Sequence, residues 1–278
     1  FANLKKLGII NSVETYSMAL NDFRSVLQVL NQVKPSEVYN LSGQSSVGLS
    51  FDQPVETMES ISIGTLNLME AIRFISKEIR FYNAGSSECF GDRAADAPAN
   101  ENTPFHPQSP YAVAKSAAHW QVATYRDAYG LFACTGILFN HESCLRPKRF
   151  VTRKIVETAR RIAQGSNEKL ILGNTKVIRD WGWSPEYVEA MWRILQTDNP
   201  EDFVVATGKS TSIEKFVELV FAEFNLDWKS HVNIDGDLFR PLDLVQSHAD
   251  PSKASEKLGW KAKIYMEEVV RLMVQEVL

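Results

Sequence analysis

The first half of the chain alternates between short apolar runs and longer segments in which apolar residues recur at helical spacing. This pattern predicts strands over 36–41, 80–84 and 131–139, and helices over 64–74 and 111–129. Strands that alternate with helices are typical of a parallel sheet covered by helices on both faces. We therefore expect an α/β fold with a doubly wound parallel sheet of the Rossmann type, whose ligands bind beyond the carboxyl ends of the strands.

The second half of the chain is less regular. A capping pattern at 211–214 predicts a helix that continues to about Phe224. The pair at 250–251 predicts the start of a short helix that Gly259 ends. Apolar residues on one helical face predict a last helix over 266–277. We expect this half to form a smaller α/β domain that binds the substrate.

The expected domains are a dinucleotide-binding domain over 1–141, to which part of 175–210 returns, and a substrate domain over most of 142–278. Residues 1–35 contain a single glycine, Gly8, and lack the strand, glycine-rich turn and helix that open such folds. We infer that an N-terminal β-α unit is missing from this sequence and expect the chain alone to bind NADP(H) poorly. A fold that never had this unit is the alternative.

Composition excludes several classes of protein. The net charge is -4 and the lysines and arginines are scattered, so we expect no nucleic-acid partner. No apolar stretch reaches the roughly 18 residues of a membrane span. Cys89, Cys134 and Cys144 show no metal-ligand spacing and do not form a disulfide framework, so we expect no metal and a cytoplasmic location.

A tyrosine and a lysine one helical turn apart carry the first chemical signal. Tyr111 and Lys115 are at positions i and i+4, so they share one face of the helix predicted over 111–129. An ammonium beside a phenol lowers the pKa of the phenol, and the phenolate can accept a hydroxyl proton while hydride leaves the same carbon. The spacing alone is far more typical of an ordinary exposed helix face.

A second motif follows the strand predicted over 80–84. Ser86, Ser87 and Glu88 come directly after it, where side chains point into the ligand crevice of a parallel sheet. Ser86 could hydrogen-bond the oxygen that Tyr111 deprotonates, and Glu88 would bring a carboxylate to the same place. A polar turn that leaves the sheet is the alternative interpretation.

Together the two motifs resemble the catalytic group of the extended short-chain dehydrogenase/reductase family. Further motifs, in order from about residue 36 to the end of the chain, resemble the GDP-mannose 4,6-dehydratases within that family. They are Leu138–Ser143, Phe150–Lys154, Leu172–Asn174, Arg179–Gly182, Ala206–Gly208, Phe239–Pro241 and Lys257–Trp260.

The resemblance implies a lyase that converts GDP-mannose to GDP-4-dehydro-6-deoxy-mannose with a tightly bound NADP that is regenerated in each turnover. It implies that Tyr111 is the base for the C4 hydroxyl, that Lys115 tunes this base, and that Ser86 positions the sugar. Glu88 would remove the C5 proton. Epimerases of the family usually carry a small residue there, so Glu88 favours a dehydratase over an epimerase or a C4-reductase.

The resemblance also implies two sets of binding residues. The cofactor contacts are Leu41, Ser42, Gln44, Tyr111, Lys115 and His141. The substrate contacts are Ser87, Asn140, Val151, Lys154, Arg179, Arg240 and Asp243. Arg179 and Arg240 suit a diphosphate, because a guanidinium offers forked donors to phosphate oxygens. His141 has no convergent partner, so no catalytic role is assigned to it.

Some positions depart from the family pattern. Ala19 stands near a place where the family often has an aspartate that reaches the adenine, so adenine recognition is expected to differ. Cys144 replaces a common proline, and Ser42 lies in a run that is more usually Ala-Ala-Gln. None of these changes removes a catalytic group.

Two other functions stay open. One is a dehydratase of another GDP-sugar, such as a GDP-heptose, because the substituent at C6 is a matter of pocket shape. The other is a non-catalytic nucleotide-sugar-binding protein, which would have no need of all four catalytic groups. We expect a homodimer or homotetramer in either case.

Overall fold

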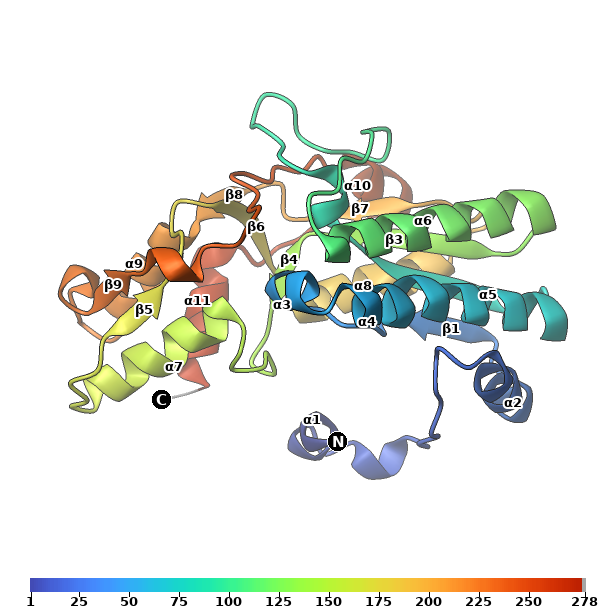
Figure 1. The fold of residues 1–278 in the computed structure, drawn as a ribbon, viewed down its shortest axis with the longest axis horizontal. Helices are drawn as coiled ribbons and strands as arrows, with labels where there is room; N and C mark the ends of the chain where they lie inside the picture. Colours follow the sequence, from blue (N-terminus) through green and yellow to red (C-terminus); the bar gives the residue numbers. More distant parts are fainter. Residues whose placement is uncertain (277–278) are drawn as a thin grey trace.

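Four parallel strands form the larger sheet of the computed structural model, which describes residues 1–276 (Figure 1). Their order is β1 (Glu37–Asn40), β2 (Arg80–Ser86), β3 (Ala133–Leu138) and β7 (Phe203–Val205). Every residue of β3 is buried, and so is every residue of β2 except the first. Strands buried on both faces are typical of α/β folds, and the predicted fold class is confirmed.

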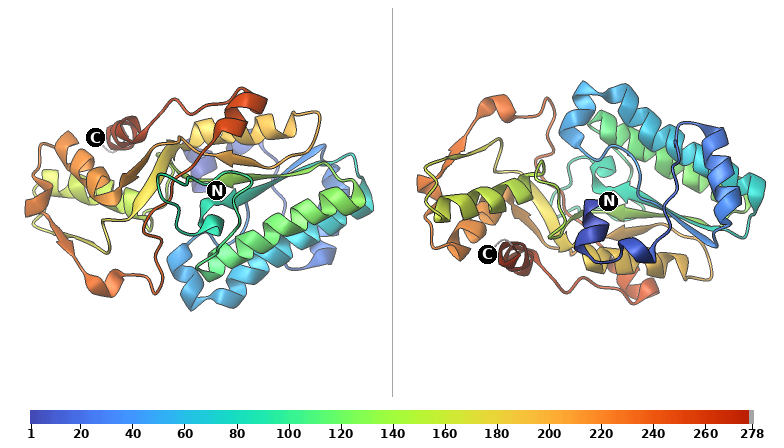
Figure 2. Two further views of the ribbon diagram at one scale, coloured as in Figure 1. Left: turned by 90° about the horizontal axis from the view of Figure 1, so that it is seen from above. Right: turned by 90° about the horizontal axis from the view of Figure 1, so that it is seen from below.

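Helices cover both faces of this sheet (Figures 1 and 2). On one face α2 (Phe23–Val33), α5 (Gly64–Ile75) and α6 (Pro110–Tyr129) share a core with the side chain of Phe81. On the other face α8 (Ser184–Leu195) packs against Tyr82 and Phe203. Neighbouring residues of one strand thus point to opposite cores, which is the alternation that a strand imposes.

A smaller body adjoins the carboxyl ends of these strands (Figure 1). It contains a sheet of β4 (Asn140–Glu142), β6 (Ile178–Trp183) and β8 (Ser210–Ser212), and a pair formed by β5 (Leu170–Leu172) and β9 (Val232–Ile234). Its core is built by α7 (Val151–Ala163), α9 (Ile213–Glu223) and α11 (Met266–Gln275), with Trp181 among the buried residues.

Short elements connect these parts. They are α1 (Ala2–Lys6), η1 (Ile10–Ser12), α3 (Val47–Asp52), α4 (Pro54–Met58), η2 (Glu59–Ile63), η3 (Ser87–Phe90), η4 (Trp228–Ser230), η5 (Gly236–Leu238) and α10 (Ser252–Leu258). β4 follows β3 after a single residue, whereas β7 returns from the smaller body to the larger sheet. The domain boundaries at 141 and 142 stay a prediction.

The strongly periodic elements match the sequence prediction, and the capping positions do not. The helices and strands expected over 64–74, 80–84 and 111–129 are all present. The helix expected from Thr211 is instead capped by Ser212, whose hydroxyl accepts a hydrogen bond from the Lys215 amide at 3.1 Å. Thr211 is held in β8, where it pairs with Arg179 of β6, so it is not free to cap the helix.

Other outcomes concern the ends of elements. Gly259 ends α10 in the left-handed conformation, as expected, but the cap of that helix is Pro251. The last helix is confirmed as far as Gln275; positions 277 and 278 of the predicted helix and domain lie outside the described residues. No helix within 1–276 is long and apolar enough to cross a membrane. That part of the chain also holds no cluster of three or more residues suited to bind a metal ion.

Candidate active site

The end of β2 and the start of η3 place the hydroxyl and carboxyl groups. Ser86 is the last residue of β2 and caps η3, since its Oγ accepts a hydrogen bond from the Glu88 amide at 3.3 Å. Accepting that bond leaves the hydroxyl hydrogen of Ser86 available to a ligand. A side chain at position 85 would lie 2.7 Å from the Thr135 methyl carbon, so only glycine lets β2 and β3 approach here.

The start of α6 places the phenol and the ammonium. Ser109 caps the helix by accepting from the Ala112 amide at 3.1 Å, and Pro110 occupies its first turn. Tyr111 and Lys115 then follow one turn apart, with the Lys115 nitrogen 5.9 Å from the centre of the Tyr111 ring. Lys115 is buried and donates to the Ala84 carbonyl oxygen at 2.9 Å, which joins α6 to the end of β2.

Burial dominates the electrostatics of these two side chains. It lowers the pKa of Lys115 to about 8, because the charged ammonium is poorly solvated. It also raises the pKa of Tyr111, while the neighbouring Ser86 hydroxyl works in the opposite direction. The sequence pattern predicted a lowered pKa for Tyr111, and that prediction is wrong for this cavity. The Lys115 ammonium is directed at Ala84, and burial of the phenol outweighs the other effects.

Glu88 occupies a position that suits a base of raised pKa. Burial raises the pKa of its carboxyl above the usual value, and the positive charges of Arg179 and Arg240 partly oppose this. A carboxylate with a raised pKa is a stronger base for carbon acids than an exposed one. The geometry therefore supports proton removal from a carbon next to a carbonyl group.

Two arginines converge on one carboxylate beside Glu88. Arg179 is buried on β6, and its guanidinium lies 3.4 Å from Oδ1 of Asp243. Arg240 lies on the loop after η5, and its guanidinium is also 3.4 Å from Oδ1 of Asp243. Arg179 and Arg240 are 61 residues apart in the sequence, yet the fold brings both guanidinium groups to the same carboxylate oxygen. Such a pair can bind a diphosphate in its fork of donors.

One cavity of about 610 Å³ contains most of the predicted site residues. Its lining includes Leu41, Ser86, Ser87, Glu88, Tyr111, Lys115, Asn140, His141, Val151, Lys154, Arg179, Arg240 and Asp243. Ser42 and Gln44 are absent from this lining. Ser42 bonds to Oδ1 of Asn40, and the Gln44 amide donates to the Ser46 carbonyl oxygen at 2.8 Å. Their role as cofactor contacts stays a prediction, as do the roles of the lining residues.

His141 lies on β4 in the wall of the cavity. Its Nδ1 is 2.8 Å from the Phe139 carbonyl oxygen, and its ring stacks on Tyr187 at 4.7 Å. Burial lowers the pKa of His141 to about 4, so the ring is neutral at neutral pH. A neutral, stacked imidazole suits packing against a ligand better than proton transfer.

Sequence reasoning missed a buried ion pair in the same wall. Glu142 is 1% exposed, and its carboxylate lies 3.1 Å from the Nε atom of Arg146. Burial raises the pKa of Glu142 to about 7, although Arg146 and Thr152 act to lower it. The Arg146 guanidinium stacks 3.9 Å from the centre of the Phe150 ring. Glu142 lies within the family-like motif Leu138–Ser143, and this location in the sequence could have marked it as a residue of the site.

Comparison with known proteins supports the same family. The family model described as GDP-mannose 4,6 dehydratase matches residues 2–273. GDP-mannose 4,6 dehydratase 1 of Arabidopsis thaliana is 48% identical over 261 residues, which cover 92% of this chain and 72% of that protein. GDP-mannose 4,6-dehydratase of Vibrio cholerae is 43% identical, covering 92% of this chain and 77% of its own length.

A solved structure supports the fold. RMD from Pseudomonas aeruginosa, complexed with NADPH, superposes with a TM-score of 0.86 at 22% identity and covers 99% of this chain and 95% of that one. At this identity the likeness concerns the fold alone. The family model, however, matches residues 2–273, and the two relatives match most of the chain at 48% and 43% identity. The chain belongs to the GDP-mannose 4,6-dehydratase family.

Proposed function

We propose that this protein is a lyase that converts GDP-mannose to GDP-4-dehydro-6-deoxy-mannose. One observation carries the proposal: Ser86, Glu88, Tyr111 and Lys115 line one end of a cavity whose other end holds a pair of arginines. A nucleotide diphosphate bound by those arginines would direct its sugar towards the four reactive groups. Relatives that share 40–48% of their residues with this chain are named for this reaction.

The cavity also fits a nicotinamide cofactor. Lys115 uses one of its three N–H donors on Ala84, which leaves two for the hydroxyls of a ribose. The cavity that contains Tyr111 and Lys115 is also lined by Leu41, which follows β1 directly, and by His141. These four residues would hold the cofactor. NADP, when bound, would accept a hydride from C4 of the sugar and return it to C6.

Tyr111 would remove the proton of the C4 hydroxyl, because its phenol lies beside Ser86 at the carboxyl end of β2. The Ser86 hydroxyl, which accepts a hydrogen bond from the Glu88 amide, would donate its own hydrogen to the same sugar oxygen and hold it in place. The phenolate of Tyr111 is the form that would accept this proton, and the raised pKa makes that phenolate a strong base. The Lys115 ammonium, one helical turn away, would stabilise the negative charge of the phenolate.

Glu88 would remove the proton at C5, which becomes acidic once C4 is a ketone. The C6 hydroxyl then leaves and takes up the proton from Glu88, so water is the second product. A proton delivered to C5 at the end balances the one that Tyr111 took from the hydroxyl. Hydride loss and return leave no net change of the cofactor.

The nucleotide end would bind substrate through the smaller body. Arg179 and Arg240 would hold the diphosphate, Asp243 the ribose, and Val151 with Lys154 the guanine. Asn140 and Ser87 would contact the part of the substrate nearest the sugar. The expected homodimer or homotetramer, and the expected cytoplasmic location, stay predictions.

The test is direct. The purified chain is incubated with a panel of GDP-sugars and a large excess of NADP⁺, because this chain alone is expected to bind the cofactor weakly. Products are measured by mass spectrometry. The expected result is loss of one water from GDP-mannose, with a 4-keto product and catalytic use of NADP⁺. Dehydration of a GDP-heptose in preference to GDP-mannose would show that the proposed substrate is wrong while the proposed reaction is right. Binding of GDP-mannose with no product would support the non-catalytic alternative.

A further inference from the structure

A backbone segment that follows Arg240 and Asp243 contacts both the strand that carries Arg179 and the loop that carries Glu88. Residues 245–247 follow Arg240 and Asp243 closely in the chain. The Ile178 amide donates to the Val245 carbonyl oxygen at 2.9 Å, and the Ser247 amide donates to the Ile178 carbonyl oxygen at 3.1 Å. Segment 245–247 is therefore bound to the beginning of β6, next to Arg179.

The other side of this segment is bound to the loop that carries Glu88. The amides of Val245 and Gln246 both donate to Oδ1 of Asp92, at 2.6 Å and 3.0 Å. The Arg93 amide donates in return to the Gln246 carbonyl oxygen at 3.0 Å. One carboxylate oxygen that accepts two successive backbone amides fixes their direction, much as a helix cap does.

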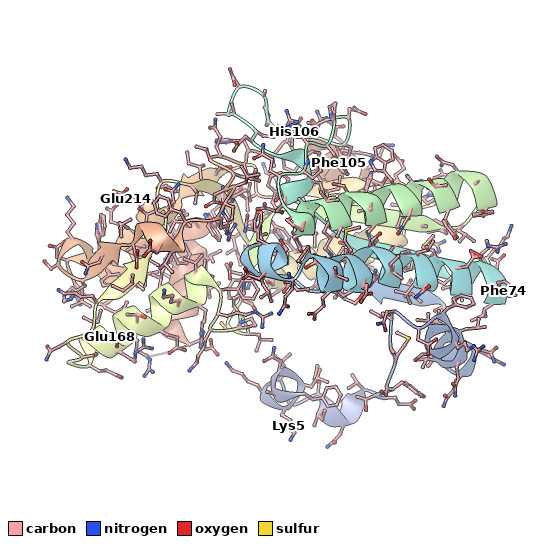
Figure 3. All side chains as sticks on the ribbon, viewed as in Figure 1. Lys5, Phe74, Phe105, His106, Glu168 and Glu214 are labelled. Atoms are coloured by element: carbon pink, nitrogen blue, oxygen red, sulfur yellow. The ribbon has the colours of Figure 1, made fainter. Side chains whose placement is uncertain are left out.

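The loop that carries Glu88 has little freedom of its own between η3 and Asp92. Gly91 has φ of +70°, and a Cβ there would lie 2.5 Å from the His106 carbonyl oxygen. The His106 amide donates to the Cys89 carbonyl oxygen at 2.8 Å, and His106 and Phe105 lie above the start of α6 (Figure 3). Asp92 thus lies four residues after Glu88 in a packed loop, and the contact between Asp92 and segment 245–247 is close to Glu88 in the chain.

We infer that Asp92 is a positioning residue that couples occupancy of the diphosphate site to the placement of Glu88. A diphosphate that draws Arg240 and Asp243 into a fixed arrangement also fixes 245–247, and Asp92 carries this order to the C5 base. Binding energy from a remote part of a substrate is then used to orient the reacting group. The inference rests on the proposed function, and it assigns Asp92 no contact with the substrate.

Hydrogen–deuterium exchange tests the coupling without turnover. GDP is added to the full chain loaded with NADP⁺, and exchange is followed in peptides covering 86–93 and 239–247. We expect GDP to protect both segments in the wild type. In Asp92→Ala, GDP should still protect 239–247 but no longer 86–93. The matched control is Asp96→Ala, an exposed aspartate of the same loop for which no side-chain hydrogen bond is found within 1–276; it should behave as wild type.

Kinetics with GDP-mannose separate positioning from simple loop stability. Asp92→Ala should lower kcat about five- to tenfold, the loss of one cap-like interaction, with KM changed less than threefold. The isotope effect with substrate deuterated at C5 should rise, because proton transfer to Glu88 becomes slower. Asp92→Asn keeps the accepting oxygen and should restore most of kcat.

Three results would overturn the inference. They are retained protection of 86–93 in Asp92→Ala, a rise in KM with kcat unchanged, and an Asn variant as impaired as the Ala variant. A wild type in which GDP protects both segments but GDP-mannose is not dehydrated would instead contradict the proposed function and leave the coupling supported.

Discussion

Burial raises the pKa of Tyr111, so its neighbours determine how readily it loses its own proton and becomes the phenolate that can act as the C4 base. The Ser86 hydroxyl works against this increase, while the Lys115 ammonium donates one hydrogen bond to the Ala84 carbonyl oxygen. We predict that Tyr111→Phe lowers kcat by about 100- to 10,000-fold, the usual contribution of a general base. GDP affinity, measured by calorimetry, should stay within a few-fold.

The control for this variant is Tyr129→Phe, at the exposed end of the same helix, which should keep full activity. Turnover of the Tyr111→Phe protein near the wild-type rate would exclude the phenol as the C4 base.

Glu88 should separate oxidation from dehydration. Glu88→Gln removes the C5 base but leaves the groups around C4 in place, so a single turnover should show transient NADPH absorbance without a 6-deoxy product. In the wild type, activity should fall as the pH drops through the raised pKa of Glu88, because the protonated carboxyl cannot accept the C5 proton. This fall should begin at a higher pH than for an exposed carboxylate. Normal product formation by the Gln variant would remove Glu88 from the mechanism.

Glu142 should make stability depend on pH. Its pKa in the folded state, about 7, lies above that of the unfolded chain, so the folded state binds the proton more tightly. The stabilisation is therefore fully present below the unfolded value and is lost as the pH rises through 7. The side chain in Glu142→Gln stays neutral at every pH. The free energy of unfolding of this variant should therefore increase relative to that of the wild type between pH 5 and pH 8, by up to about 3 kcal/mol. Denaturant unfolding at several pH values measures this, and a constant difference would contradict it.

The sequence predicted the placement of individual catalytic residues, which depends on residue type and spacing. It did not predict their pKa values, which depend on burial. Ser86, Glu88, Tyr111 and Lys115 stand in short motifs, whose spacing places them at the end of a strand or on one helix face. The direction of the Tyr111 pKa was predicted wrongly, because burial is a property of the fold and not of the motif.

Strand β6 and the loop after η5 supply arginines of different rigidity to one diphosphate site. Arg179 is fixed within a paired strand and is buried, whereas the Arg240 side chain is 39% exposed. Pro241 restricts Arg240 to extended backbone, as its sequence indicates. The convergence of two distant motifs was predictable only through the family resemblance, because no local pattern relates them.

We predict that Arg240→Ala raises KM for GDP-mannose by roughly ten- to a hundredfold, the loss of about 1.5–3 kcal/mol from a charge-assisted hydrogen bond. The kcat should change less, because the diphosphate is remote from the reacting carbons. Arg240→Lys should recover only part of the affinity, since an ammonium lacks the fork. Arg24→Ala, at an exposed position of α2, is the control. An unchanged KM in folded Arg240→Ala protein would make Arg240 an ordinary surface arginine.

Long helices with a periodic apolar face were predicted well from the sequence, whereas strands of three residues were not. α5, α6 and α11 each bury a continuous face, and this face determines the spacing of their apolar residues. β4, β5 and β9 have three residues each, too few to show a period. The start of α9 was predicted one residue early, because pairing in β8 takes Thr211 away from the helix.

Ligand contacts from both bodies should make the whole molecule respond to nucleotide. GDP bound to the folded state alone at a hundred times its Kd should add about 2.7 kcal/mol to the free energy of unfolding. For a chain of this size the melting temperature should rise by roughly 5–10 °C. Thermal scans with GDP, and with UDP as the control, measure this effect. Equal shifts with the two nucleotides would show that the site does not distinguish the base.

The division of the cavity between two bodies has a consequence for how such enzymes diverge. The groups proposed to react with the sugar lie on β2, η3 and α6, whereas those proposed to hold the nucleotide lie on α7, β6 and the 239–247 loop. Mutations that alter nucleobase preference can therefore accumulate in one body while the other keeps its chemistry. The residues proposed to act on the sugar and those proposed to bind the nucleotide can therefore be altered separately, and segment 245–247 is one of the connections between them.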